Sequence, residues 1–216
     1  LPEKLEPLNA VHKGRIINAI NAMAPGKACG VDGLFAEFYK SGSEEIALVL
    51  EELLRKIYRT KKIPKEWRTA IIVPVFKGKN SDKDIANYRP IAVTCVARRI
   101  YERVLLEQLE EETEMLQNQQ NGFRRRRSTL QQVFALNEIM ADRVLHNVFL
   151  DLKAAYDIVN REKLWRKLAT EFNIHQHLID QLKALFDFNE SILVIGGKKS
   201  SAIANLRGLL QGSALS

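Results

Sequence analysis

The stretch that most constrains the fold covers residues 147–160 and reads Asn-Val-Phe-Leu-Asp-Leu-Lys-Ala-Ala-Tyr-Asp-Ile-Val-Asn. Val148, Phe149 and Leu150 predict a short buried strand that ends directly before Asp151. Because an ionised aspartate is seldom buried without a partner, Asp151 requires a basic side chain, backbone donors or a metal ion. An aspartate that only caps the following helix is the plain structural alternative.

Composition and charge narrow the class of protein. Of the 216 residues, 46% are hydrophobic and 27% charged, which is typical of a folded domain. No apolar run reaches membrane-spanning length, and no signal-peptide pattern is present. The net charge of +7 favours a polyanionic partner. Cys29 and Cys95 lack metal-ligand spacing and indicate free thiols in a reducing compartment. The start at Leu1 and the end at Ser216 lead us to expect a piece of a longer protein.

Helical periodicity is clearest in the first half of the chain. It predicts helices over residues 8–23, 43–60 and 95–112, with Ser43 as the N-cap of the second. The glycine-rich loop over 24–33 allows close backbone approach. The residues expected to face inward are Val11, Ile16, Ile20, Ile46, Leu50, Leu53, Leu54, Ile57, Ile100, Val104 and Leu105.

A basic hairpin is predicted next. Residues 70–76 read as a buried strand that Pro74 places at an edge or a bend, and the sequence becomes apolar again at 87–91. Two strands around a basic turn would hold Lys77 and Arg89 over one surface, an arrangement that suits phosphate. A solvated hairpin with incidental charge is the alternative.

Residues 119–129 form a second basic segment. Its four consecutive arginines, 124–127, repel one another unless an anion lies among them. A solvated surface or a nuclear-localisation-like patch would also fit. Ser128 is expected to cap a helix in which Val133, Leu136, Met140 and Val144 recur at helical spacing.

The remaining sequence predicts helices over 161–172 and 178–186, with Trp165 in the core. Residues 191–195 and 202–206, joined by Gly-Gly-Lys-Lys, predict a hairpin. The last ten residues predict a turn into a helix. In that turn Gly208 and Gly212 allow tight geometry and Gln211 can hydrogen-bond a base or a sugar.

Five of these segments, in the same order, resemble motifs of the reverse transcriptases of non-LTR (LINE-type) retrotransposons. They are residues 24–39, the strand with Lys77 and Asn-Tyr-Arg-Pro-Ile at 87–91, Gln120 with Gly122-Phe123 and Arg127-Ser128-Thr129, Leu150–Asp157, and Gly208–Ser216. One departure is Leu210, where the family usually has proline.

The resemblance implies an α+β right-hand polymerase fold that is truncated at its C-terminus. Residues 1–143 would form helix-rich fingers with β-hairpins. Residues 144–216 would form an incomplete palm that begins an antiparallel sheet and contributes a fingers hairpin near 191–207.

The implied activity is that of an RNA-directed DNA polymerase, which in the intact protein adds dNTPs to a primer 3′ end by two-metal phosphoryl transfer. The partners would be an RNA template, a DNA primer, dNTP and the rest of the polymerase, with no membrane. Asp151 would be the catalytic carboxylate and would hold Mg²⁺ together with the Leu152 carbonyl. Asp157 is interpreted as structural.

Further roles are implied for nucleotide and template contacts. The predicted nucleotide-binding residues are Lys77 and Arg89 at the triphosphate, Tyr156 against a ribose 2′-hydroxyl, and Gln211 and Gly212 in the pocket. The predicted template-binding residues are Gly122, Phe123, Arg124, Arg125, Arg126, Arg127, Ser128 and Thr129.

The family's remaining metal carboxylates lie in an aromatic-Ala-Asp-Asp motif that these 216 residues do not contain. We therefore predict that this chain alone does not polymerise DNA. A truncated, non-catalytic module that binds RNA or DNA is the alternative function. An intracellular location is expected, in the nucleus if the host is eukaryotic.

Overall fold

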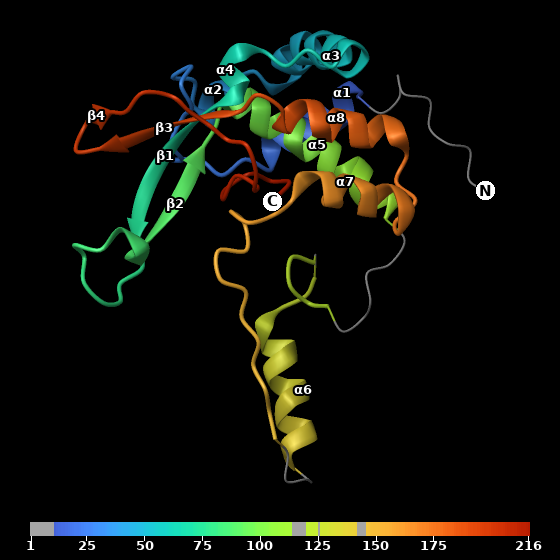
Figure 1. Cartoon of the computed structure of the whole chain (residues 1–216). Helices are drawn as coiled ribbons and strands as arrows, with labels where there is room; N and C mark the ends of the chain where they lie inside the picture. Colours follow the sequence, from blue (N-terminus) through green and yellow to red (C-terminus); the bar gives the residue numbers. More distant parts are fainter. Residues whose placement is uncertain (1–10, 114–119, 125, 142–145) are drawn as a thin grey trace.

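The computed structural model describes residues 11–113, 120–124, 126–141 and 146–216, and Figure 1 shows the whole chain. Helices occupy both halves of the chain, and the longest strands are β1, β2 and β3. In order the elements are α1 (Lys13–Asn21), α2 (Ala36–Ser41), α3 (Ser43–Thr60), α4 (Lys65–Arg68), β1 (Thr69–Phe76), the 3-10 helix Ile85–Asn87, β2 (Tyr88–Val93), α5 (Val96–Glu112), α6 (Thr129–Ala141), α7 (Arg161–Thr170), α8 (Gln176–Phe186), β3 (Glu190–Ile195), β4 (Lys198–Lys199) and β5 (Ile203–Ala204).

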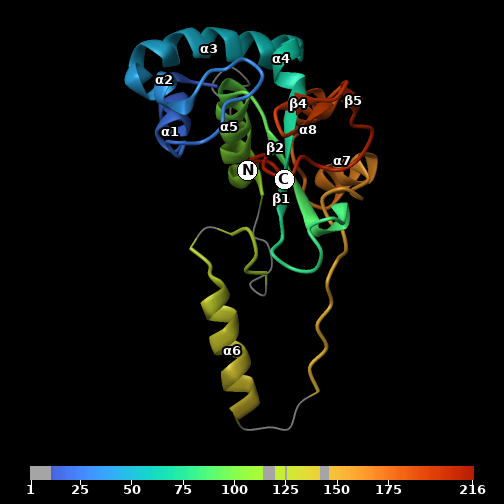
Figure 2. The same cartoon turned by 90° about the vertical axis from the view of Figure 1, so that its left-hand side faces the viewer.

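Helices α1, α3, α5, α7 and α8, here called the body, enclose one large apolar core. Helix α3 lies across the top of the body in both views, and α5 runs beneath it (Figures 1 and 2). The helices predicted over 43–60, 95–112, 161–172 and 178–186 are confirmed, as is the one predicted over 8–23 from residue 13, since residues 8–10 lie outside the described part of the chain. Most residues expected to face inward are buried. Leu53 is an exception at 36% exposure, and Gly42 rather than Ser43 is the N-cap of α3. Trp165 lies in the core, as predicted.

The loop before α2 fits closely against the start of α5. A Cβ atom on Gly30 would lie 2.4 Å from the backbone nitrogen of Cys95, so only glycine permits this approach. This confirms the close backbone contact that the glycine-rich loop predicted.

The sheet has the strand order β2-β1-β3-β4, and β5 pairs with β3. Strands β1 and β2 are antiparallel, whereas β1 and β3 are parallel, with Ala70 opposite Ser191. The hairpins expected near 70–91 and 191–207 therefore belong to one mixed sheet, and the antiparallel palm sheet stays a prediction because neither hairpin was assigned to it. Helices α7 and α8 precede β3 and return the chain so that it enters the sheet in the direction of β1.

The strand predicted over 70–76 forms with Pro74 at an edge, as expected, but it is not a buried strand, because Ala70 is its one buried residue. Strand β1 has a neighbour on both sides at Ile71 and Ile72, whereas Pro74 lies where only β2 is its neighbour, so its missing N–H interrupts no bond to β3. The hairpin that follows β3 turns at Gly196 and Gly197, and the two lysines lie in β4 rather than in the connection. Its return strand is divided into β4 and β5.

Helix α6 and the extended segment over 146–153 project away from the body (Figures 1 and 2). We call the described residues 120–124, 126–141 and 146–153 the arm. The helix was predicted correctly, but Val133 and Met140 are exposed, and Val144 lies outside the described residues.

The predicted buried strand at 148–150 is wrong. Val148, Phe149 and Leu150 are 82%, 83% and 93% exposed, and no described strand pairs with them. An apolar run becomes a strand only where a neighbouring strand accepts its backbone hydrogen bonds. The predicted helix near the C-terminus is also absent, because residues 207–216 form turns. No helix in the described part of the chain is long and apolar enough to cross a membrane.

Candidate nucleotide and nucleic-acid site

The β1–β2 hairpin carries the two predicted triphosphate contacts. Arg89 lies opposite Val75, and the Lys77 backbone N–H donates to the Asn87 carbonyl over 2.8 Å, which continues the ladder. Because side chains alternate along a strand, Lys77 and Arg89 belong to the same face of the hairpin. Both are exposed, and the Lys77 ammonium donates to the Ala86 carbonyl over 2.7 Å.

Residues 208–212, here called the Gly-Gln turn, join the segment that carries Tyr156. The Leu209 N–H donates to the Tyr156 carbonyl over 2.8 Å, and the Gly208 N–H donates to the Val159 carbonyl over 3.0 Å. Gly208 has φ +79°, and a Cβ atom there would lie 2.8 Å from the carbonyl oxygens of Tyr156 and Asp157. Glycine is therefore required at this position, because another side chain would clash with these carbonyls and would be strained at a positive φ.

The other end of the Gly-Gln turn contacts strand β2. The Ala92 N–H donates to the Gln211 carbonyl over 2.8 Å, and a Cβ atom on Gly212 would lie 2.8 Å from the Ala92 carbonyl oxygen. Gln211, Gly212 and Tyr156 are thus brought together by backbone contacts, although Tyr156 lies more than 50 residues before the turn.

A cavity of about 240 Å³ lies beside this junction. It is smaller than the roughly 300–1,000 Å³ of sites that enclose a drug-sized ligand. Its lining residues are Ile72, Pro90, Ala92, Asp157, Arg161, Ser191, Asn205, Arg207, Gly208, Leu209, Leu210 and Gln211.

Strand alternation separates the cavity from the two cations of the hairpin. Ile72 and Ala92 line the cavity and lie opposite each other across the hairpin, whereas Arg89 lies opposite Val75 on the other face. The structure therefore unites Gln211 with the Tyr156 segment, and it places Lys77 and Arg89 on a separate face of the same hairpin.

Arg161, which the sequence interpretation did not select, connects several of these segments. Its guanidinium donates to the carbonyl oxygens of Gly208, Phe186 and Arg207 over 2.8, 3.1 and 3.3 Å. It also lies 5.7 Å from the centre of the Phe186 ring. Burial lowers the pKa of Arg161 from its ordinary value, and the nearby Asp187 opposes that effect.

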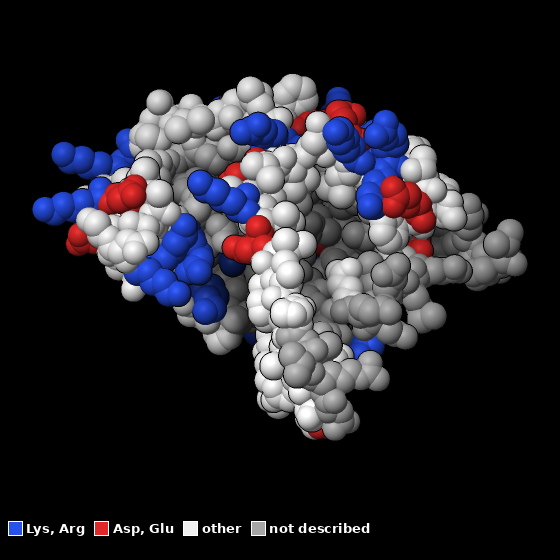
Figure 3. All heavy atoms as spheres, turned by 60° about the horizontal axis from the view of Figure 1, so that its bottom comes forward, with Lys and Arg blue, Asp and Glu red and all other residues white. Residues whose placement is uncertain are grey.

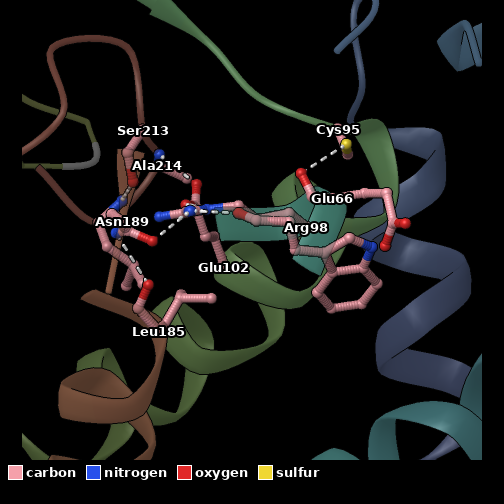
Figure 4. Close-up of polar contacts among 10 residues, drawn as sticks. Glu66, Cys95, Arg98, Glu102, Leu185, Asn189, Ser213 and Ala214 are labelled. Atoms are coloured by element: carbon pink, nitrogen blue, oxygen red, sulfur yellow. Dashed lines mark hydrogen bonds and ion pairs between the residues drawn. The ribbon is translucent and has the colours of Figure 1, made fainter. Parts of the chain in front are cut away.

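A buried ion pair holds the end of the chain (Figure 4). Arg98 and Glu102, both fully buried on α5, are joined over 2.8 Å, and Glu102 also accepts from the Ala214 N–H over 3.1 Å. The Arg98 guanidinium further donates to the Trp67 carbonyl and to the Asn189 side chain. In the sequence the pair is visible only as an Arg and a Glu four residues apart, and the other charged residues of α5 give no local sign of which pair is buried.

Asp151 is exposed and lies in the extended part of the arm. Within the described part of the chain, no ion pair or hydrogen bond joins it to Lys77 or Arg89, and no group of three His, Cys, Asp or Glu side chains could hold a metal ion. Asp151 and Leu152 offer one carboxylate and one carbonyl oxygen. That donor set does not fit a pair of Mg²⁺ ions, which prefer several oxygen ligands each.

The predicted template-contacting loop lies on the arm. Phe123 is 91% exposed and has φ +60°, and the Arg124 guanidinium donates to the Gln120 carbonyl over 3.2 Å. The Ser128 N–H donates to the Gln131 side chain over 3.2 Å. Gly122, Arg126, Arg127, Ser128 and Thr129 are exposed, and Arg125 lies outside the described residues.

Positive charge gathers at the ends of the two hairpins. In Figure 3, Lys and Arg side chains predominate on the left of the molecule, where Figure 1 shows the sheet. The exposed cations of these hairpins and their flanking loop are Lys77, Lys79, Lys83, Arg89, Lys198, Lys199 and Arg207.

Comparison with known proteins identifies the family. Residues 75–216 match the family model described as reverse transcriptase (RNA-dependent DNA polymerase). The chain is 27% identical over 188 residues to the probable RNA-directed DNA polymerase from transposon BS of Drosophila melanogaster, covering 83% of the chain and 19% of that protein. It is 26% identical over 217 aligned positions to the RNA-directed DNA polymerase from mobile element jockey of the same organism, covering 97% of the chain and 24% of that protein.

The chain therefore belongs to the reverse transcriptase (RNA-dependent DNA polymerase) family. Its similarity to the jockey and BS proteins confirms the resemblance to LINE-type retrotransposon domains. The chain spans about a quarter or less of the length of these relatives.

Proposed function

We propose that the chain is the fingers, residues 1–143, and the first part of the palm, residues 144–216, of an RNA-directed DNA polymerase that copies retrotransposon RNA. The observation that carries this proposal is the Gly-Gln turn. It bonds to Ala92 of strand β2 and to the backbone of Tyr156, and so brings Gln211 and Gly212 next to the Tyr156 segment and to the hairpin that carries Lys77 and Arg89 on its other face.

In this function Lys77 and Arg89 bind the triphosphate of dNTP, Tyr156 meets the sugar, and Gln211 and Gly212 line the nucleotide pocket. The exposed cations on one face of the hairpin support the first role, because arginine and lysine contact phosphate as a fork and as a point charge respectively. The backbone contacts of the Gly-Gln turn support the other roles.

The RNA template is assigned to residues 122–129, where the exposed ring of Phe123 is followed by the exposed Arg126 and Arg127. Phosphate contacts by arginine and stacking on Phe123 would hold a strand without reading its sequence. A DNA primer is the third partner.

Nucleotide binding is tested by measuring dATP affinity for the chain and for the double variant Lys77→Ala/Arg89→Ala. We expect roughly tenfold or greater weakening, because each lost contact is charge-assisted. Lys56→Ala/Arg59→Ala is the matched control, since both side chains are exposed on α3 away from the hairpin. Equal dATP affinity in all three proteins would contradict the assignment.

The chain alone is not expected to polymerise DNA. Asp151 and Leu152 are proposed to contribute oxygen ligands to Mg²⁺ in the intact polymerase, but they do not complete a two-ion site here. Primer extension on an RNA template with Mg²⁺ and dNTPs should give no incorporation. Robust incorporation that Asp151→Asn abolishes would show that the chain is catalytically sufficient.

A non-catalytic module that binds RNA or DNA is the second candidate, and the exposed arginine loop on the arm favours it. Its RNA binding would weaken steeply with salt and would not depend on Mg²⁺ or on Asp151. Protection of Asp151 by dNTP in the presence of Mg²⁺ would instead favour the polymerase fragment. We also propose an intracellular location, nuclear in a eukaryotic host, which the free thiols of Cys29 and Cys95 support.

A further inference from the structure

The guanidinium of Arg161 donates hydrogen bonds to main-chain carbonyl oxygens. Each of its three nitrogens donates to a carbonyl oxygen, those of Gly208, Phe186 and Arg207. These carbonyls lie 25, 46 and 47 residues away in the sequence, so the contacts are tertiary. Only arginine offers planar donors that can reach three acceptors in this way, and a lysine ammonium does not reproduce the fork.

One of those carbonyls, that of Gly208, belongs to the Gly-Gln turn that contacts Tyr156, and that of Arg207 directly precedes the turn. Gly208 accepts from Arg161 and donates to Val159, and the next residue, Leu209, donates to the Tyr156 carbonyl. Side-chain bonds from Arg161 and main-chain bonds to Tyr156 and Val159 therefore hold residues 156–161 against the Gly-Gln turn.

Packing holds this junction on one side only, where Leu209 and Leu210 contact apolar clusters. The cavity of about 240 Å³ is lined by Asp157, Arg161, Gly208 and Gln211, so part of the junction faces open space instead of apolar side chains. Where a segment lacks close-packed neighbours, its hydrogen bonds determine its position. The bonds from Arg161 thus have more influence on Tyr156 than they would in a filled core.

We propose that Arg161 is a positioning residue that sets the place of Tyr156 and thereby the preference for deoxynucleotides over ribonucleotides. The inference rests on the proposed function, because it takes Tyr156 as the side chain that meets the nucleotide sugar. Arg161 touches no substrate in this scheme and acts through the Gly-Gln turn.

The test compares the wild-type chain with Arg161→Lys, which keeps the positive charge. Arg166→Lys is the matched control, because Arg166 is exposed on the same helix. Affinities for dATP and ATP give the deoxy preference as a ratio, and amide hydrogen exchange reports the bonds donated by Gly208 and Leu209. We expect Arg161→Lys to lower the ratio roughly tenfold, since a shift of about 1 Å can cost far more than that, and to speed exchange at both amides.

The ratio separates positioning from a general loss of structure. Partial unfolding would weaken dATP and ATP binding equally and leave the ratio unchanged, whereas displacement of Tyr156 changes the ratio itself. In a Tyr156→Ala background, Arg161→Lys should have no further effect on the ratio, because the ring through which it acts is gone.

The outcomes distinguish this inference from the proposed function. If the wild-type chain prefers dATP and Arg161→Lys leaves the preference unchanged, the inference is overturned and the proposed function stands. If the wild-type chain binds neither nucleotide, the proposed function is overturned and the role of Arg161 in sugar selection falls with it. Unchanged exchange at Gly208 and Leu209 would overturn the inference in either case.

Discussion

The body and the arm each contain a long helix with apolar residues at helical spacing, but only the helix of the body is buried on one side. Helix α3 in the body buries Ala47, Leu50, Leu54, Ile57 and Tyr58, whereas no residue of α6 in the arm is buried. Both helices are predicted by apolar spacing after a serine that can act as N-cap, and both form. The comparison shows that apolar spacing determines whether a segment is helical, while burial depends on which other elements reach that segment.

The largest expected effect tests the polar centre of the body. Arg98→Met leaves the Glu102 carboxylate buried without its partner, so the free energy of unfolding should fall by about 3–5 kcal/mol. Urea denaturation measures the loss. Arg59→Met, on an exposed position of α3, should change stability by less than about 0.5 kcal/mol. Equal stability of the two variants would show that the ion pair does not support the body.

A matched leucine pair tests the comparison directly. Leu54 is fully buried in α3 and Leu130 is 74% exposed in α6. Leu54→Ala should lower the free energy of unfolding by about 2–5 kcal/mol, and Leu130→Ala should stay within about 0.5 kcal/mol of the wild type. Thermal or chemical unfolding of both variants gives the two values. A large cost at Leu130 would mean that α6 is packed in solution.

A glycine pair tests the junction beside the body. Gly208→Ala places a Cβ atom 2.8 Å from two carbonyl oxygens at φ +79°, and should cost about 1–3 kcal/mol of unfolding free energy. On the arm, a Cβ atom on Gly122 meets nothing within 4 Å, so Gly122→Ala should leave the unfolding midpoint nearly unchanged. If Gly208→Ala is equally harmless, the Gly-Gln turn does not hold the position described.

The smallest effect concerns thiol reactivity and leaves the fold intact. Burial raises the pKa of the Cys95 thiol to about 11, and its Sγ donates to the Glu66 carbonyl over 3.3 Å. Because only the thiolate is alkylated, Cys95 should stay unmodified by iodoacetamide at pH 8 while the half-exposed Cys29 reacts. Mass spectrometry of the native chain tests this, and urea should release the second site. Rapid native alkylation of Cys95 would contradict its burial.

Sequence reasoning succeeded where the deciding interactions are local. The stripe of α3, the inward residues of α5 and the glycine hairpin after β3 all follow from spacing or turn chemistry. It failed at Val148–Leu150, because an apolar run predicts a strand only if another strand pairs with it, and none of the described strands does.

In the candidate site, too, some residues could be found from the sequence and others only from the structure. The nucleotide-contacting residues were selected by resemblance to family motifs, and the structure adds the contacts among Gln211, Ala92 and Tyr156. Arg161 was missed because nothing in its local sequence separates it from an ordinary charged residue at the start of a helix. Its importance lies in three carbonyls supplied by distant segments.

The sequence by itself determined the helices, the basic hairpin and the motifs by which the chain is identified as a member of the reverse transcriptase family, since each depends on residues close together in the chain. Only the tertiary structure decided the parallel pairing of β1 with β3, the burial of Arg98 with Glu102 and the separation of Arg89 from the cavity. Local spacing fixes backbone conformation through short-range sterics and hydrogen bonds. Which distant segment supplies a partner depends on how the whole chain excludes water from its apolar surfaces.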